Sequence, residues 1–228
     1  MGDVVKSLVA GTDGRLPLML LALTAVTGIV DAVSILALGR VFVANMTGNV
    51  VFIGFAVAGA AGFSLAASLC GLGGFLVGAG AGGRLIARLG PDRSRLFAVA
   101  VTIELLLFAI ATLVVRLSAS SSGTGRRDVA VAMGTQNAVA RHLAVPDLTT
   151  TVLTMTLTGL ASDLRHGSRE GLVRRLLAVL SMFAGAVVGA TLVLQQSPTT
   201  ALVTGSALLA IVVATSWNAS RSANRDGR

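Results

Sequence analysis

The chain has 228 residues, of which 54% are hydrophobic and 12% are charged, and its mean hydropathy is +0.84. Because a soluble domain carries about 25% charged residues, this composition excludes a water-soluble globular fold and predicts an all-α, polytopic membrane bundle. Lys and Arg (18) outnumber Asp and Glu (10), but the basic residues lie in short clusters between apolar runs, which is typical of membrane-topology signals and gives no reason to expect a nucleic-acid partner.

Five apolar runs are long enough to cross a bilayer, which takes about 20 residues. The first is too long for the apolar core of a signal peptide, about 7 to 15 residues, so we expect it to remain as a span. Two further regions are apolar but interrupted by polar residues. The predicted spans are 16–38, 65–85, 96–115, 176–194 and 201–217, and the interrupted regions are 41–61 and 129–160.

Two acidic residues lie inside predicted spans, Asp31 in the first and Glu104 in the third. An ionised carboxylate there costs at least about 2.5 to 3.5 kcal/mol, so each is expected to face a cavity or a partner. One interpretation is a pair of proton- or cation-binding acids. The alternatives are that Asp31 reaches interfacial water or caps a following segment, and that Glu104 is a protonated acid that hydrogen-bonds between helices.

The first interrupted region opens with Asn45, Thr47, Gly48 and Asn49. Glycine permits unusual dihedrals, and Asn and Thr satisfy backbone groups that are freed where a helix breaks. A broken helix at membrane depth offers a helix N-terminus and free carbonyls, the ingredients of a small-ion or solute site. The alternative is an ordinary N-cap at the membrane surface.

The second interrupted region carries Gln136, Asn137 and a run of threonines that includes Thr150 and Thr154. Threonine hydroxyls can bond their own helix backbone, so some of these residues are expected to be structural. Thr154, which corresponds to Thr47 in the repeat described next, is the preferred ligand candidate among the threonines.

The two parts of the chain echo each other. Residues 28–33 (GIVDAV) and 134–139 (GTQNAV) both read G-x-x-[D/N]-A-V, and each is followed by a Thr- or Asn-rich segment and then by glycines at four-residue spacing. Such glycines are a signature of close helix packing in membranes. The sequence therefore predicts one membrane domain over 1–228 with repeated halves at 16–117 and 128–217, a linker at 118–127 and a solvated basic tail at 218–228.

The number of spans in each half decides whether the halves run parallel or inverted. If the polar segments enter and return, the chain has six full spans and two re-entrant segments, and a cytoplasmic N-terminus places about 14 of the 18 basic residues inside. Eight full spans place about 12 inside. The first topology is preferred, eight spans remain the alternative, and both predict a multi-pass protein of the cytoplasmic membrane with its basic loops and C-terminus inside.

Signatures of soluble enzymes are absent from the sequence, which contains no P-loop, no G-x-S-x-G and no HExxH. With two histidines and the single cysteine Cys70, the sequence predicts no metal centre, no cofactor and no intramolecular disulfide. We therefore expect a protein that is not an enzyme.

Residues 24–54 (TAVTGIVDAVSILALGRVFVANMTGNVVFIG) and 134–164 (GTQNAVARHLAVPDLTTTVLTMTLTGLASDL) resemble the YoaK-like family of bacterial inner-membrane proteins, domain of unknown function 1275. The resemblance implies a polytopic protein of the cytoplasmic membrane and supplies no substrate. In that pattern a glycine more often follows the threonine that matches Thr154, where this chain has Met155. This departure puts the chemical equivalence of the two polar segments in doubt.

The leading functional hypothesis is a small secondary transporter or permease for an unidentified small solute or ion. The acids would couple a proton or cation, and the Asn, Gln and Thr side chains would contact the solute. The alternative is a non-transporting scaffold or accessory subunit of the bilayer, with homo-oligomerisation left open.

Overall fold

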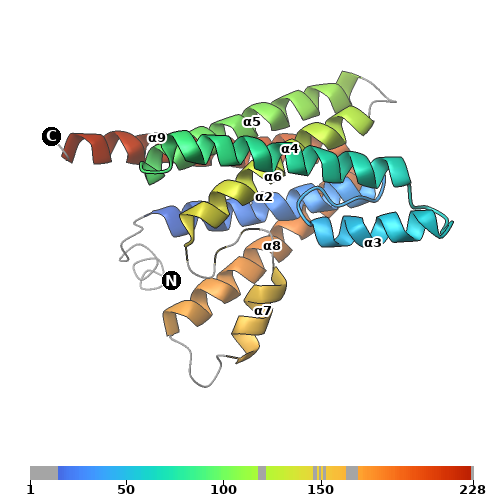
Figure 1. Cartoon of the computed structure of the whole chain (residues 1–228), viewed down its shortest axis with the longest axis horizontal. Helices are drawn as coiled ribbons and strands as arrows, with labels where there is room; N and C mark the ends of the chain where they lie inside the picture. Colours follow the sequence, from blue (N-terminus) through green and yellow to red (C-terminus); the bar gives the residue numbers. More distant parts are fainter. Residues whose placement is uncertain are drawn as a thin grey trace.

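The computed structural model describes residues 15–117, 122–145, 148, 150, 153–162 and 169–226. Within these residues the chain forms eight helices (Figure 1). They confirm the predicted all-α class. The helices are α2 (Leu16–Leu36), α3 (Met46–Val57), α4 (Leu65–Leu89), α5 (Arg93–Leu117), α6 (Ser122–Leu143), α7 (Leu153–Ser162), α8 (Arg169–Gln195) and α9 (Pro198–Asp226).

Five of these helices, α2, α4, α5, α8 and α9, are long and apolar enough to cross a membrane. They coincide with the five predicted spans, so the chain is a multi-pass membrane protein. Helix α6 has 22 residues, but its charged and polar residues keep its hydropathy below that of the other five.

Local sequence signals set several helix ends. Ser64 accepts a hydrogen bond from the Ala67 N–H at 3.2 Å and caps α4, and Asp92 accepts one from the Arg95 N–H at 2.9 Å at the start of α5. Helix α2 ends just before Gly39, whose φ of 93° lies in the region that glycine occupies readily.

The short helices α3 and α7, with 12 and 10 residues, follow reversals of the chain. Their lengths of about 18 and 15 Å are well below the roughly 30 Å of a hydrocarbon core. Residues 37–45 turn back beside the C-terminal part of α2 before α3 begins (Figure 1), and the Ala44 N–H donates to Asp31 of α2. The described parts of α3 and α7 are therefore each shorter than a full span.

Close backbone contacts hold the bundle together. Helix α2 packs most extensively against α8, and α4 against α6. A Cβ added to Gly28 would lie 2.7 Å from the Ala186 nitrogen, and one added to Gly134 would lie 2.8 Å from the Ala79 nitrogen. Only glycine lets these pairs approach so closely.

Helices extend into the two regions that the sequence analysis assigned to a linker and a tail. Helix α6 begins at Ser122, so residues 122–127 of the expected linker 118–127 are helical, and 118–121 lie outside the described residues. Helix α9 continues to Asp226, so most of the expected tail 218–228 is also helical. In both places no proline follows the helix start to stop it, and small polar residues do not by themselves end a helix.

Candidate functional site

The most buried acid of the described chain is Glu104, in the middle of α5, with 1% of its surface exposed. The Gln136 side chain of α6 lies beside it. With the amide oriented so that nitrogen faces the carboxyl group, Nε2 of Gln136 donates to Glu104 Oε1 at 2.6 Å and lies 3.3 Å from Oε2. This orientation gives both ends of the amide a partner, because the amide oxygen then faces the Thr150 hydroxyl.

Hydroxyl groups lie on the other side of the Gln136 amide. Its oxygen then accepts from Thr150 Oγ1 at 3.1 Å, and Thr27 Oγ1 lies 3.4 Å from the same end of the amide. Thr150 is buried, and its φ of 59° lies in the left-handed region, which is unusual for a β-branched residue. Four parts of the chain therefore meet in one polar cluster, formed by Thr27, Glu104, Gln136 and Thr150.

No basic side chain among the described residues forms an ion pair with Glu104. The one described ion pair joins Arg127 and Asp128, at 3.6 Å, near the start of α6. The described residues also contain no group of three or more His, Cys, Asp or Glu side chains that could hold a metal ion. The cluster can therefore offer a carboxyl group, an amide and hydroxyls, which are ligands for a proton or a small polar solute.

A small apolar void of about 10 Å³ adjoins the cluster, with Glu104 and Gln136 at its margin and Leu20, Leu23 and Phe97 in its wall. That volume is on the scale needed by a single water molecule. Leu20 and Phe97 belong to the first turns of α2 and α5, so the void points from Glu104 toward the bundle end where these helices begin.

Asp31 lies one turn after Thr27 on α2, about 6 Å along the helix axis. One of its carboxyl oxygens accepts from the Ala44 N–H, whereas Oδ1 is buried and has no hydrogen-bond partner. Asp31 therefore lies next to the polar cluster but contacts the segment that follows α2.

The Asn49 amide is occupied by the chain itself. Its side chain is 0% exposed, Oδ1 accepts from the Phe42 N–H at 2.9 Å, and Nδ2 donates to the Phe42 carbonyl. Gly48 lies against the ring of Phe42, where a Cβ would come 2.7 Å from Cε2. These two predicted site residues brace the turn between α2 and α3.

Two arginines that the sequence interpretation did not single out bind helix ends. Arg126 of α6 is buried and donates through Nε to the Leu38 carbonyl at 2.5 Å. Arg93 of α5 donates through Nη2 to the Leu143 carbonyl at 2.8 Å. Leu143 is the last residue of α6, whose carbonyl has no intrahelical partner, and Leu38 lies just after the end of α2.

Family comparison agrees with this architecture. A family model described as a protein of unknown function (DUF1275) matches residues 19–215. This chain belongs to the DUF1275 family. The UPF0700 transmembrane protein YoaK of Bacillus subtilis (strain 168) is 36% identical over 154 residues, which cover 64% of this chain and 65% of that relative. No solved structure matches the chain.

Membership of the DUF1275 family confirms the resemblance predicted from the two polar strings, and it supplies no substrate or site. The structure brings together three of the ten predicted site residues, Glu104, Gln136 and Thr150, with Asp31 one helical turn from the cluster. Asn137 lies apart, on a hollow between α4 and α6, where its Nδ2 donates to the Met133 carbonyl.

The other predicted ligands lie elsewhere in this DUF1275 member. Asn45, Thr47 and Thr154 are exposed, and no described cavity is lined by Asp31, Asn49, Glu104 and Asn137 together. The residue that sequence reasoning missed is Thr27. A signal for it existed, since the polar residues of α2 recur at three- and four-residue spacing and so share one face; they are Thr24, Thr27, Asp31 and Ser34.

Proposed function

We propose that this chain is a small secondary transporter in which Glu104 carries a coupling proton and the surrounding amide and hydroxyl groups contact a small polar solute. The observation that carries the proposal is a buried carboxyl group that has no basic partner among the described residues and lies where α2, α5, α6 and Thr150 meet. Acids at membrane depth mark proton relays and solute pathways.

The protonation state of Glu104 follows from the free-energy cost of burying an ionised carboxylate. An unpaired carboxylate in this position costs at least about 2.5 to 3.5 kcal/mol. Against this cost the Gln136 amide supplies a single donor. The resting cluster is therefore expected to hold a protonated acid. Release of that proton requires water or a solute to reach the carboxyl group, which couples proton movement to opening of the bundle.

Equivalent contacts in the two parts of the chain support an inverted repeat. Gly28 of α2 lies against α8, and Gly134 of α6 lies against α4. Helix α3 packs on α4, as α7 packs on α8. Helices α2 and α6 run in opposite directions through the bundle (Figure 1). Inverted repeats with broken helices are the framework of alternating access in several transporter folds.

The proposed topology has six full spans, with α6 as the sixth. Its 22 residues extend about 33 Å, and its contacts with α4 and α5 bury much of its polar surface. The positive-inside rule then assigns the arginine-rich end to the cytoplasm. That end includes the C-termini of α4 and α9 and the N-termini of α5 and α8 (Figure 1).

The proposal gives different roles to the other residues that the sequence predicted as ligands. Asp31 is a second acid on the same face of α2, one turn from the cluster, with a free buried oxygen. Asn45 and Thr47, being exposed, are placed to meet a solute before it enters. Asn49 and Gly48 hold the first returning segment in position.

Reconstituted protein tests the proposal. Proteoliposomes that contain a pH-sensitive dye are given a panel of small metabolites, and wild type is expected to show proton movement that depends on one class of solute. Glu104→Gln should abolish this movement without unfolding the protein, and Asp31→Asn should reduce it. Asp92→Asn is the matched control, because Asp92 is an acid that caps the N-terminal end of α5. Equal flux in wild type and Glu104→Gln, or no flux with any solute, contradicts the proposal.

One observation favours the alternative of a membrane scaffold: Asn49 and many threonine hydroxyls bond to their own chain, as in Thr27 to Leu23 at 3.0 Å. A scaffold predicts that Asn49→Ala and Asp31→Ala change thermal stability and partner co-purification together, with no solute-dependent proton flux in any variant.

A further inference from the structure

A hollow on the side of the bundle lies apart from the Glu104 cluster. It has a volume of about 550 Å³, and it is lined by Phe75 and Ala79 of α4, by α6 from Asn137 to Arg141, and by the turn that follows α6 at Val145 and Leu148. Ala140 lines both this hollow and the small void beside Glu104. One wall of α6 thus separates the two spaces.

The wall of the hollow is mainly apolar. Phe75, Val145 and Leu148 provide large side chains, and alanines form the floor, so a flexible hydrocarbon chain can lie close to the helix backbones. The flank belongs to α4, a candidate membrane span. Its outward residues Leu76 and Val77 are 61% and 67% exposed, as expected of a surface that faces acyl chains. The hollow lies beside this span, and its apolar lining suits an acyl chain.

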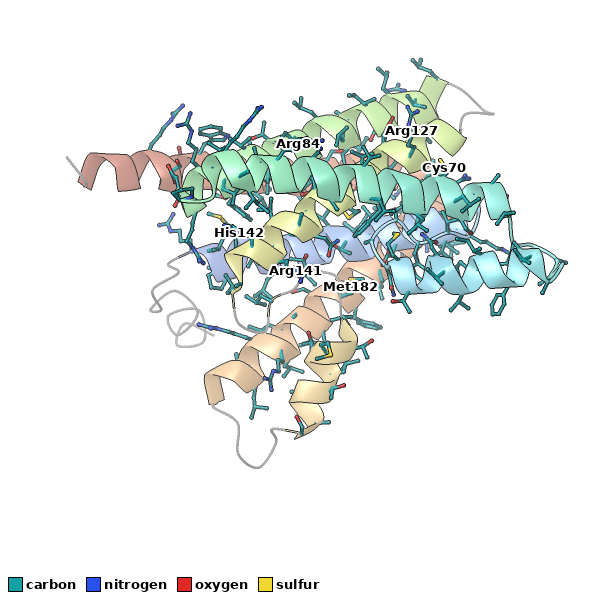
Figure 2. The ribbon with its side chains drawn as sticks, viewed as in Figure 1. Cys70, Arg84, Arg127, Arg141, His142 and Met182 are labelled. Atoms are coloured by element: carbon teal, nitrogen blue, oxygen red, sulfur yellow. The ribbon has the colours of Figure 1, made fainter. Side chains whose placement is uncertain are left out.

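Positive charge lies at one end of the hollow. Among the described lining residues the charged side chain is Arg141, which is exposed in the last turn of α6. Figure 2 shows Arg141 and His142 at this end of α6, on different sides of the helix. Arg93 joins the same end through its hydrogen bond to the Leu143 carbonyl at 2.8 Å. An apolar groove with a basic rim complements an anionic amphiphile.

We propose that this hollow binds one acyl chain of an anionic phospholipid, with the phosphate-bearing headgroup at Arg141. Basic sites between membrane helices bind such headgroups, and a long basic side chain reaches the interface while its stem stays on apolar surface. The site does not depend on the transport activity proposed above. It lies against Val145 and Leu148, so the bound lipid packs on the described residues that follow α6.

The test uses purified full-length protein in detergent, to which phosphatidylglycerol or phosphatidylcholine of matched chain length is added, and bound lipid is counted by native mass spectrometry. Phosphatidylglycerol should bind wild type more tightly than phosphatidylcholine does. Arg141→Gln should weaken phosphatidylglycerol binding by about fivefold, the value of one basic residue near anionic lipid, and Arg141→Lys should retain it.

Arg84→Gln is the control, because Arg84 is exposed on α4 and its Nη1 lies 3.5 Å from the Gly80 carbonyl outside the hollow. Its phosphatidylglycerol binding should equal that of wild type, and both glutamine variants should keep the wild-type melting temperature. The proposal is overturned if the two lipids bind equally, or if Arg141→Gln and Arg84→Gln lose the same amount of phosphatidylglycerol binding. It is also overturned if glycerol 3-phosphate displaces phosphatidylglycerol from the site, or if the protein is a dimer that dissociates in Arg141→Gln.

Discussion

The described residues that follow α2 and α6 use their polar side chains differently. After α2, Asn49 binds the backbone of Phe42, and the rings of Phe42 and Phe52 stack with centroids 5.6 Å apart. After α6, the Thr150 hydroxyl faces Gln136 and, through it, Glu104. The first segment is bound mainly to itself, whereas Thr150 of the second is bound to Gln136 of α6, which in turn contacts the buried Glu104 of α5.

This difference has a chemical cause. An asparagine amide has both a donor and an acceptor and can pair with a whole peptide unit, whereas a threonine hydroxyl makes fewer bonds and can turn to a neighbour. The first segment therefore suits a fixed support. The proposed function requires the second to respond when Glu104 gains or loses a proton, so the two segments differ in their chemistry.

The largest loss of stability is expected when the hydrogen bonds that support the first segment are removed. Asn49→Ala leaves a buried N–H and carbonyl of Phe42 without their partners, at about 1 to 3 kcal/mol each. We expect a strongly lowered melting temperature in detergent. Thr156→Ala, at a buried position of α7, should cost about 1 kcal/mol. Equal losses in the two variants would show that both segments are braced alike.

The shared framework is tested at the glycine contacts. In Gly78→Ala and Gly185→Ala, the new methyl group would overlap the backbone at Val131 and Ala25, so each variant should lose about 1 to 3 kcal/mol or more. Gly73→Ala is the matched control, because nothing lies within 4 Å of its added Cβ. It should be neutral or raise the melting temperature slightly. A tolerant Gly185→Ala with an intolerant Gly78→Ala would mean that the halves pack differently.

The two arginines at helix ends sharpen the comparison further. Arg126→Gln removes the bond to Leu38 before the first segment, and Arg93→Gln removes the bond to Leu143 before the second. A hydrogen bond from a charged group contributes about 1.5 to 3 kcal/mol. Arg126→Gln should have the larger effect on melting temperature, since Arg126 is buried. A larger loss of melting temperature in Arg93→Gln would mean that the second segment is attached more strongly than the first.

The smallest stability change is expected for Thr150→Val, which loses one hydrogen bond worth about 0.5 to 1.5 kcal/mol. Solute-dependent proton flux should nevertheless fall, because the Gln136 amide is no longer held toward Glu104. Thr158→Val is its control, since the Thr158 hydroxyl bonds its own helix at the Thr154 carbonyl at 2.9 Å. Equal flux in Thr150→Val and wild type would remove Thr150 from the site.

The sequence predicted the parts of the molecule that depend on local composition. The five apolar spans follow from hydropathy, and the glycine spacing predicted close packing such as that between Gly78 and α6. Helix α6 was recognised only as an interrupted region, because its polar residues lower its hydropathy and their burial depends on α4 and α5.

The site was harder to predict, because it is assembled by tertiary contacts. Glu104, Gln136 and Thr150 were each singled out by their polarity, but their meeting depends on the turn after α6. Thr27 was missed because threonine is ordinary in a membrane helix. Arg126 was not singled out, whereas the fold uses it to bind the Leu38 carbonyl after α2.

Infrared difference spectroscopy of the reconstituted protein tests the central claim most directly, by recording the carboxyl C=O band while a pH gradient and a transported solute are applied. We predict that wild type and Asp31→Asn lose a protonated-carboxyl band and gain a carboxylate band, and that Glu104→Gln shows neither change. An unchanged wild-type spectrum during solute uptake, or the same band pair in Glu104→Gln, would contradict the assignment of the coupling proton to Glu104.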